Sequence, residues 1–120
     1  MNEAVFQPTL LTDVKPGMPA FDEELFGPVA AAMKIKNLEE AIALSNQSKF
    51  GLGVAIYTRN TTSLKPYLSQ FNEGGVFVNS IVKSDPRIPF GGVKNSGYGR
   101  ELSDEGLMAF VNIKTVYIND

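Results

Sequence analysis

The sequence predicts an α/β fold in which helices flank a mostly parallel sheet. Segments with the two-residue periodicity of strands alternate along the chain with segments that have the 3.6-residue periodicity of helices. That order is typical of parallel strands joined by right-handed crossovers. The chain has 120 residues, of which 43% are hydrophobic and 20% charged, so we expect one globular domain or part of one.

Two strands are predicted before the first helix. Residues 5–14 have the composition of a strand, and Pro8 within them indicates an edge strand or a bulge. Residues 15–20 are rich in proline and glycine and predict a loop. Residues 29–36 place apolar side chains at alternate positions, which predicts a half-buried strand.

A capped helix and a third strand follow. Asn37 is the expected N-cap of the helix, and Glu40 occupies the position of the acid in a capping box. Gly51 is the expected end of the helix. Residues 54–58 are mostly β-branched or aromatic and predict a short strand.

A second helix is predicted from four apolar residues that share one helical face: Leu64, Tyr67, Leu68 and Phe71. Because proline is tolerated only in the first turn of a helix, Pro66 requires a start close by, with Thr62 or Ser63 as N-cap. The glycine pair at 74–75 should end this helix.

The rest of the chain adds a strand, a long loop, a helix and a last strand. Residues 76–79 predict a strand, and residues 80–100 have no periodicity. A helix should begin near Ser103 and continue through Val111, and residues 114–118 predict the last strand. A loop as long as 80–100 is uncommon in a compact domain and is often functional.

Charge and composition exclude several classes of function. Eleven Lys and Arg against 13 Asp and Glu give a net charge of −2, which argues against nucleic acid or an anionic membrane as partner. The chain has no Cys and no His, so by itself it forms no thiolate nucleophile, Cys/His zinc site or Ser-His-Asp triad. With no membrane span and no leader pattern in the sequence, we expect a cytoplasmic protein.

The glycine-rich loop (residues 90–101) and the acidic segment (residues 21–29) each allow two interpretations. The glycine-rich loop fails the spacing of both a P-loop and a dinucleotide fingerprint, so a tight surface loop is the simpler interpretation. The acidic segment is either a solvated turn or the support for a carboxylate that binds the vicinal hydroxyls of a ribose, with a Phe against a flat ring.

Residues 80–88 form the third candidate. Lys83, Ser84 and Arg87 have the chemistry to bind a carboxylate or a phosphate. The simpler interpretation is a solvated loop tip.

Taken together, these segments resemble the C-terminal part of the aldehyde dehydrogenase superfamily. The similarity rests on five blocks in the same order, FDEELFGPV (21–29), SKFGLGVAIYTRN (48–60), GGVFVNS (74–80), PFGGVKNSGYGRE (89–101) and VNIKTVYI (111–118). The stretch VNSIVKSDPRIPFGG (78–92) is most similar to the succinate-semialdehyde dehydrogenase group. The resemblance implies a partial catalytic domain over residues 1–110 and an oligomerisation strand over residues 111–120.

The resemblance also implies roles for individual residues. Glu24 would bind the hydroxyls of the nicotinamide ribose, and Phe26 would lie against the nicotinamide of NAD or NADP. Phe90 would line the substrate tunnel, and Ser84 would help to hold a substrate carboxylate. Arg87 is added to the substrate site on its charge alone, and no metal site is expected.

The family reaction uses a Cys thiolate and hydride transfer to NAD(P), and this chain has neither the Cys nor the dinucleotide-binding domain. We therefore expect no aldehyde oxidation and weak or no NAD(P) binding by the chain alone. Its expected partners are the missing N-terminal part of the enzyme and further copies of itself, through an edge strand or the C-terminal strand. Two alternatives are a non-catalytic oligomerisation or binding module and an unrelated small α/β nucleotide binder.

Overall fold

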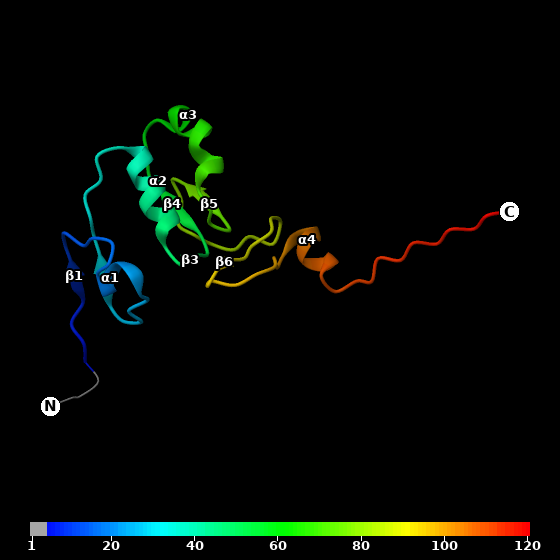
Figure 1. Ribbon diagram of the computed structural model, residues 1–120, viewed down its shortest axis with the longest axis horizontal. Coiled ribbons are helices and arrows are strands. Elements are labelled where there is room, and N and C mark those ends of the chain that lie inside the picture. The colour runs from blue at the N-terminus through cyan, green and yellow to red at the C-terminus, as the bar shows by residue number, and fades with distance from the viewer. Residues whose placement is uncertain (1–4) are drawn as a thin grey trace. The chain divides into compact units, whose positions relative to one another are not determined.

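The computed structural model describes residues 5–120, which belong to two compact units, Met1–Lys49 and Phe50–Asp120 (Figure 1). Among the described residues, strands pair into three separate two-stranded sheets, two of them parallel. The predicted combination of helices with parallel strands is therefore confirmed. The prediction of one sheet is wrong, because no described strand pairs with more than one other.

The first unit is built on a parallel pair, β1 (Thr9–Leu11) and β2 (Val29–Ala31). Both strands are shorter than predicted. Pro8 has no N–H to offer a neighbouring strand, and a positive φ of +56° at Asp13 turns the chain away soon after β1. The connection between the two strands contains a short helix, α1 (Pro19–Asp22), where a loop was expected up to residue 20. Pro19 begins this helix, the position where proline is best tolerated.

The capped helix of the first unit is α2 (Leu38–Gln47), and its predicted start is confirmed. The Asn37 side chain accepts a hydrogen bond from the Glu40 N–H (2.9 Å), and the Glu40 carboxylate accepts one from the Lys36 N–H (2.6 Å). Ile42 on the apolar face is buried. The predicted end at Gly51 is wrong, because the helix already ends at Gln47, with Ser48 as its C-cap.

Gly51 lies instead in β3 (Phe50–Gly51), which pairs antiparallel with β6 (Val93–Lys94) in the second unit. A Cβ at Gly51 would come within 2.7 Å of the Val93 side chain. The glycine is therefore required by close packing between two strands, which local sequence does not reveal.

The second unit also contains a β–α–β arrangement, in which β4 (Val54–Ile56) and β5 (Val76–Val78) run parallel. The chain between them forms α3 (Thr61–Leu64) and a 3₁₀ helix, η1 (Lys65–Gln70). The N-cap of α3 is Asn60, so the prediction of Thr62 or Ser63 is wrong. The Asn60 side chain accepts a hydrogen bond from the Ser63 N–H (3.1 Å).

Pro66 explains why one predicted helix becomes two short ones. A proline inside an α-helix loses a hydrogen bond and clashes with the preceding turn, whereas near the start of a new helix it does neither. Here Pro66 lies close to the start of η1. The predicted apolar face is nevertheless confirmed at its two ends, since Leu64 and Phe71 are both buried.

The last helix, α4 (Ser103–Met108), begins where expected and ends before Val111. Residues 114–118 form no strand within this chain, so that prediction is wrong for the chain alone, and Figure 1 shows the segment as an extended tail. Residues 111–120 are all exposed. A strand needs a partner for its backbone groups, and the described chain supplies none here. No described helix has the length and hydropathy needed to cross a membrane.

Candidate functional site

The acidic segment leads from α1 into β2 and contains Glu24 and Phe26. After α1, Glu23 is extended and its N–H donates to the Pro19 carbonyl (2.9 Å). Glu24 is exposed. Phe26 has a φ of +45°, and 90% of its surface is accessible to solvent.

This conformation of Phe26 is unusual on two counts. A left-handed backbone costs a residue with a side chain roughly 1 kcal/mol, and aromatic residues gain most of their stabilisation from burial. Because the ring is exposed, packing within the described chain does not compensate for the strained backbone, and the ring gains little stabilisation from burial. Backbone strain of this kind gathers at binding sites, where it presents a side chain in a fixed direction.

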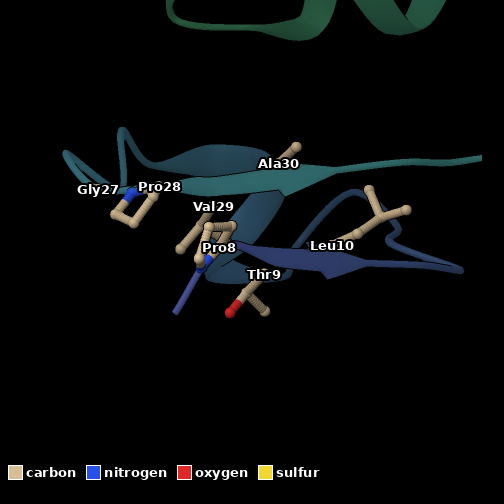
Figure 2. Close-up of a pocket in the computed structure, with 7 residues that line it drawn as sticks. All are labelled: Pro8, Thr9, Leu10, Gly27, Pro28, Val29 and Ala30. Carbon is tan, nitrogen blue, oxygen red and sulfur yellow. The ribbon is translucent and has the colours of Figure 1, made fainter. Parts of the chain in front are cut away.

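The β1–β2 pair, together with the end of the acidic segment, forms an open pocket of about 490 Å³ (Figure 2). Its lining is mostly apolar and uncharged, and comprises Pro8, Thr9, Leu10, Gly27, Pro28, Val29 and Ala30. Glu24 and Phe26 are not among these residues. The pocket therefore suits an apolar group and offers no side chain for acid–base chemistry.

The loop 80–88 leaves the sheet at the end of β5, where Asn79 fixes its start. The Asn79 N–H donates to the Ile56 carbonyl (2.7 Å), and its side chain accepts from the Thr58 N–H (2.8 Å). Ser84 is exposed further along the loop.

Arg87, expected on charge grounds to bind an anion, is paired with Asp85. Its Nε and Nη2 donate to the two carboxylate oxygens of Asp85 at 2.9 and 2.6 Å, and its backbone N–H donates to one of them at 3.0 Å. These hydrogen bonds hold the pKa of Asp85 well below its ordinary value, and the same pairing raises the pKa of Arg87. The carboxylate of Asp85 thus already neutralises the charge that Arg87 would offer a ligand.

The glycine-rich loop is the tight loop that its simpler interpretation predicts, and it folds back on itself as a hairpin. Phe90 and Glu101 close its base with two backbone hydrogen bonds of 2.9 and 2.8 Å. Gly97 and Gly99 have positive φ values of +128° and +79°. At Gly91, a Cβ would come within 2.6 Å of the Gly99 carbonyl on the opposite arm, so the two arms lie in contact.

Arg100 is a residue of this loop that the sequence analysis did not single out. Its Nη1 donates to the carbonyls of Gly92 (3.0 Å) and Gly99 (2.7 Å). At the tip, the Ser96 hydroxyl accepts from the Gly51 N–H (3.0 Å), which ties the loop to β3. The sequence feature that could have indicated this role is an Arg inside a glycine-rich stretch, because few side chains there can donate hydrogen bonds to the backbone carbonyls.

The predicted site residues fall into two groups. Glu24 and Phe26 belong to the unit Met1–Lys49, and Ser84, Arg87 and Phe90 belong to the unit Phe50–Asp120. Within the second unit, Ser84 and Phe90 flank the Asp85–Arg87 pair along the chain. The described residues contain no group of three His, Cys, Asp or Glu side chains that would hold a metal ion.

Comparison with known proteins places this chain in a family. A model of the aldehyde dehydrogenase family matches residues 1–116. A probable NADP⁺ succinate-semialdehyde dehydrogenase of Synechocystis sp. is 52% identical over 94% of this chain and 25% of its own length. A succinate semialdehyde dehydrogenase [NAD(P)⁺] of Escherichia coli is 49% identical over 93% of this chain and 24% of its own length.

The solved structures that are similar to this chain belong to the same family as these sequence relatives. The succinic semialdehyde dehydrogenase of Streptococcus pyogenes in complex with NADP⁺ superposes with a TM-score of 0.88 and 40% identity, over 96% of this chain and 25% of that one. An aldehyde dehydrogenase of Mycobacterium tuberculosis complexed with NAD⁺ gives a TM-score of 0.80 and 39% identity, over 87% and 21%. The chain spans about a quarter of the length of these curated relatives. It belongs to the aldehyde dehydrogenase family.

Proposed function

We propose that this chain is one part of an NAD(P)-dependent aldehyde dehydrogenase, an oxidoreductase acting on succinate semialdehyde or a similar aldehyde that carries a carboxylate. In this proposal the chain contributes residues that contact cofactor and substrate, and the thiolate nucleophile comes from the remainder of the enzyme. Two facts support this division. The chain has no Cys, and its relatives extend over about four times the matched length.

The observation that carries the cofactor side of the proposal is the conformation of Phe26. An exposed aromatic ring on a strained backbone is suited to lie against a flat ring such as nicotinamide. Two residues earlier, the exposed carboxylate of Glu24 has the two acceptor oxygens that vicinal ribose hydroxyls need. These residues fit one end of NAD or NADP, which when bound would accept a hydride from the substrate. The role of the chain is to hold that end in the orientation required for transfer.

On the substrate side, we assign the aldehyde's carboxylate to Ser84 and its carbon chain to Phe90. The exposed Ser84 hydroxyl is a donor for a carboxylate oxygen, and the half-buried Phe90 offers an apolar wall. Arg87 is already paired with Asp85, so it makes a smaller contribution to this site than its charge alone suggests.

The chain alone should oxidise no aldehyde, and it should bind NAD(P) weakly or not at all, because it holds only one end of the cofactor. We propose that it acts in the cytoplasm, bound to the remaining part of the enzyme and associated with further copies of itself through an edge strand or residues 111–120. A strand edge with unpaired backbone groups favours such pairing.

The test is reconstitution. The purified chain is mixed with the complementary region of a relative, and NAD(P)H formation is followed at increasing concentrations of succinate semialdehyde and of aldehydes without a carboxylate. We expect turnover only in the mixture, with preference for the carboxylate-bearing aldehyde. Turnover by the chain alone, or no turnover in a mixture that forms a stable complex, would refute the proposal.

Neighbouring residues provide matched controls for this test. Glu24→Gln should raise the KM for NAD(P), whereas Glu23→Gln should leave it unchanged, since the two acids are adjacent and only Glu24 is assigned to the cofactor. An equal effect of both substitutions would refute the assignment of Glu24. Ser84→Ala should raise the KM for succinate semialdehyde and spare that for an aldehyde without a carboxylate.

A non-catalytic oligomerisation module is the second candidate, and the C-terminal tail favours it. The tail has five large apolar residues, and each is exposed over 49% to 83% of its surface: Val111, Ile113, Val116, Tyr117 and Ile118. Large exposed apolar surfaces seek partners. This candidate predicts a stable oligomer by size-exclusion chromatography with light scattering, together with no turnover in any mixture. A monomer at high concentration would count against self-association in both proposals.

A further inference from the structure

We propose that Arg100 is a positioning residue for the substrate site. Its guanidinium holds the two arms of the glycine-rich loop together and thereby fixes the backbone that carries Phe90. The effect of Arg100 on substrate binding rests on the proposed function, in which Phe90 contacts the substrate. The hold of Arg100 on the loop can be measured in the chain alone, without the reconstituted enzyme.

The glycine-rich loop needs such a constraint. Four of its residues are glycines, at 91, 92, 97 and 99, and glycine leaves the backbone more freedom than any other residue. Regular pairing between the arms is confined to the Phe90–Glu101 bridge at the base. Gly91 packs against the Gly99 carbonyl, and turn hydrogen bonds join Ser96 to Val93 (3.1 Å) and Gly97 to Lys94 (3.3 Å) near the tip. Van der Waals packing has little directional preference, so a hydrogen-bonded contact at Gly92 is what would fix the segment that follows Phe90.

Arg100 supplies that contact with two charge-assisted hydrogen bonds. Its Nη1 reaches the Gly92 carbonyl on the opposite arm (3.0 Å) and the Gly99 carbonyl on its own arm (2.7 Å). Hydrogen bonds from a guanidinium are roughly twice as strong as those between neutral groups. Gly92 is buried, so its carbonyl would be costly to leave without a partner.

The two ends of the loop are held by other contacts, and Arg100 acts between them. The tip is tied to β3 through the Ser96–Gly51 hydrogen bond and the β3–β6 pair. The base is closed by the Phe90–Glu101 bridge. Because Gly92 is only two residues from Phe90, a displacement of the Gly92 carbonyl is transmitted directly to the Phe90 backbone.

The first measurement is amide hydrogen exchange in the full 120-residue chain. In Arg100→Gln, the Phe90 and Glu101 amides should exchange about tenfold faster than in the wild type, since each donates across the base of the loop. In Arg100→Lys the increase should be smaller, because an ammonium can still donate but lacks the planar fork of donors. Arg59→Gln, at an exposed arginine outside the loop, is the matched control and should change neither amide.

The exchange pattern decides whether Arg100 holds the loop. Amides that join β4 to β5, such as those of Val54 and Asn79, should keep their wild-type exchange in Arg100→Gln. Unchanged exchange at Phe90 and Glu101 would overturn the proposal. An equal increase throughout the unit would also overturn it, because it would indicate general destabilisation and not a local hold.

The second measurement uses the reconstituted enzyme. Arg100→Gln should raise the KM for the aldehyde about tenfold, with the KM for NAD(P) and kcat unchanged within about twofold, and Arg100→Lys should restore part of the loss. Equal changes in both KM values would overturn the positioning role. A wild-type mixture that forms a stable complex but has no activity would refute the proposed function, while the exchange measurement would still decide whether Arg100 fixes the Phe90 backbone.

Discussion

The acidic segment and the glycine-rich loop each present a phenylalanine, and they hold it in opposite ways. Phe26 is exposed on a left-handed backbone. Phe90 is half-buried on a strand-like bridge, with Arg100 donating to the carbonyl two residues further on. The first arrangement directs a side chain through backbone strain, and the second through hydrogen bonds. Strain should be relieved by a residue that tolerates the dihedral angle, whereas a hydrogen-bonded hairpin should be damaged by any atom that separates its arms.

The largest effect is expected from Gly91→Ala in the glycine-rich loop. The new Cβ would lie within 2.6 Å of the Gly99 carbonyl and 3.2 Å of the Arg100 side chain, so the two arms would have to separate. Overpacking of this kind lowers the free energy of unfolding by about 1–3 kcal/mol. Urea unfolding followed by tyrosine fluorescence is a suitable measurement, because all four tyrosines lie in the unit Phe50–Asp120.

The matched substitution in the acidic segment is Gly27→Ala. Its Cβ would be 3.7 Å from the nearest atom, the Leu25 carbonyl oxygen, which is an ordinary contact. We expect a change of less than about 0.5 kcal/mol by circular dichroism, as for most substitutions away from packed positions. A loss as large as that of Gly91→Ala would contradict the contrast between the two regions.

Phe26→Gly should have the next largest effect, and in the opposite direction. Glycine adopts positive φ without a steric penalty, and little ring burial is lost because 90% of the Phe26 surface is exposed. Relief of about 1 kcal/mol of backbone strain is partly offset by the about 0.5–1 kcal/mol that glycine costs through the freedom of the unfolded chain, so we expect a net gain of up to about 0.5 kcal/mol in the free energy of unfolding, measured by circular dichroism. In the reconstituted enzyme the same substitution should weaken NAD(P) binding.

Leu25→Gly is the control for this prediction, because Leu25 is not among the residues with positive φ. It should lower stability by at least about 0.5–1 kcal/mol, because glycine adds freedom to the unfolded chain and because Leu25, 41% exposed, also loses its partial burial. If Phe26→Gly lowers stability by as much as Leu25→Gly, the dihedral angle of Phe26 stores no strain.

The same contrast explains what the sequence could predict. The N-cap at Asn37 and the apolar residues Leu64 and Phe71 were predicted correctly, because a cap and a helical face depend on residues a few positions apart. Gly51 was misread as a helix end, since its real constraint is the Val93 side chain, which is 42 positions further along the chain. The strand at 114–118 was predicted from composition, yet a strand also requires a partner, and composition does not supply one.

The candidate site likewise has features that local sequence predicts and features that only the folded chain shows. The motifs that contain Glu24, Phe26, Ser84 and Phe90 were recognisable as sequences, and their assignment to cofactor and substrate stays a prediction. The hold of Arg100 on Gly92 was not foreseen, because it depends on how the loop folds back on itself. The Asp85–Arg87 pair was also missed, although its members are only two residues apart. An Asp-Pro-Arg sequence in a loop is a turn signal that would have suggested it.

The smallest effect is expected from acid at the Asp85–Arg87 pair, which also distinguishes the role of Arg87 from that of Arg100. The pair lowers the pKa of Asp85, so the folded chain keeps this carboxylate ionised at pH values where the unfolded chain protonates it. Its stabilising contribution is therefore complete above the ordinary Asp pKa of about 3.9 and is lost as the pH falls below that value toward the folded pKa. The two carbonyls bound by Arg100 do not titrate, so its hold on the loop should not change with pH.

Because 84% of the Arg87 side chain is exposed, the pair should be followed by NMR titration of the Asp85 carboxyl carbon and not by unfolding. Arg87→Gln should move the titration midpoint of Asp85 up toward its ordinary value, and Arg100→Gln should leave it in place. A midpoint already at the ordinary value in the wild type would show that the ion pair does not persist in solution, and Arg87 would then be available to bind the substrate carboxylate beside Ser84.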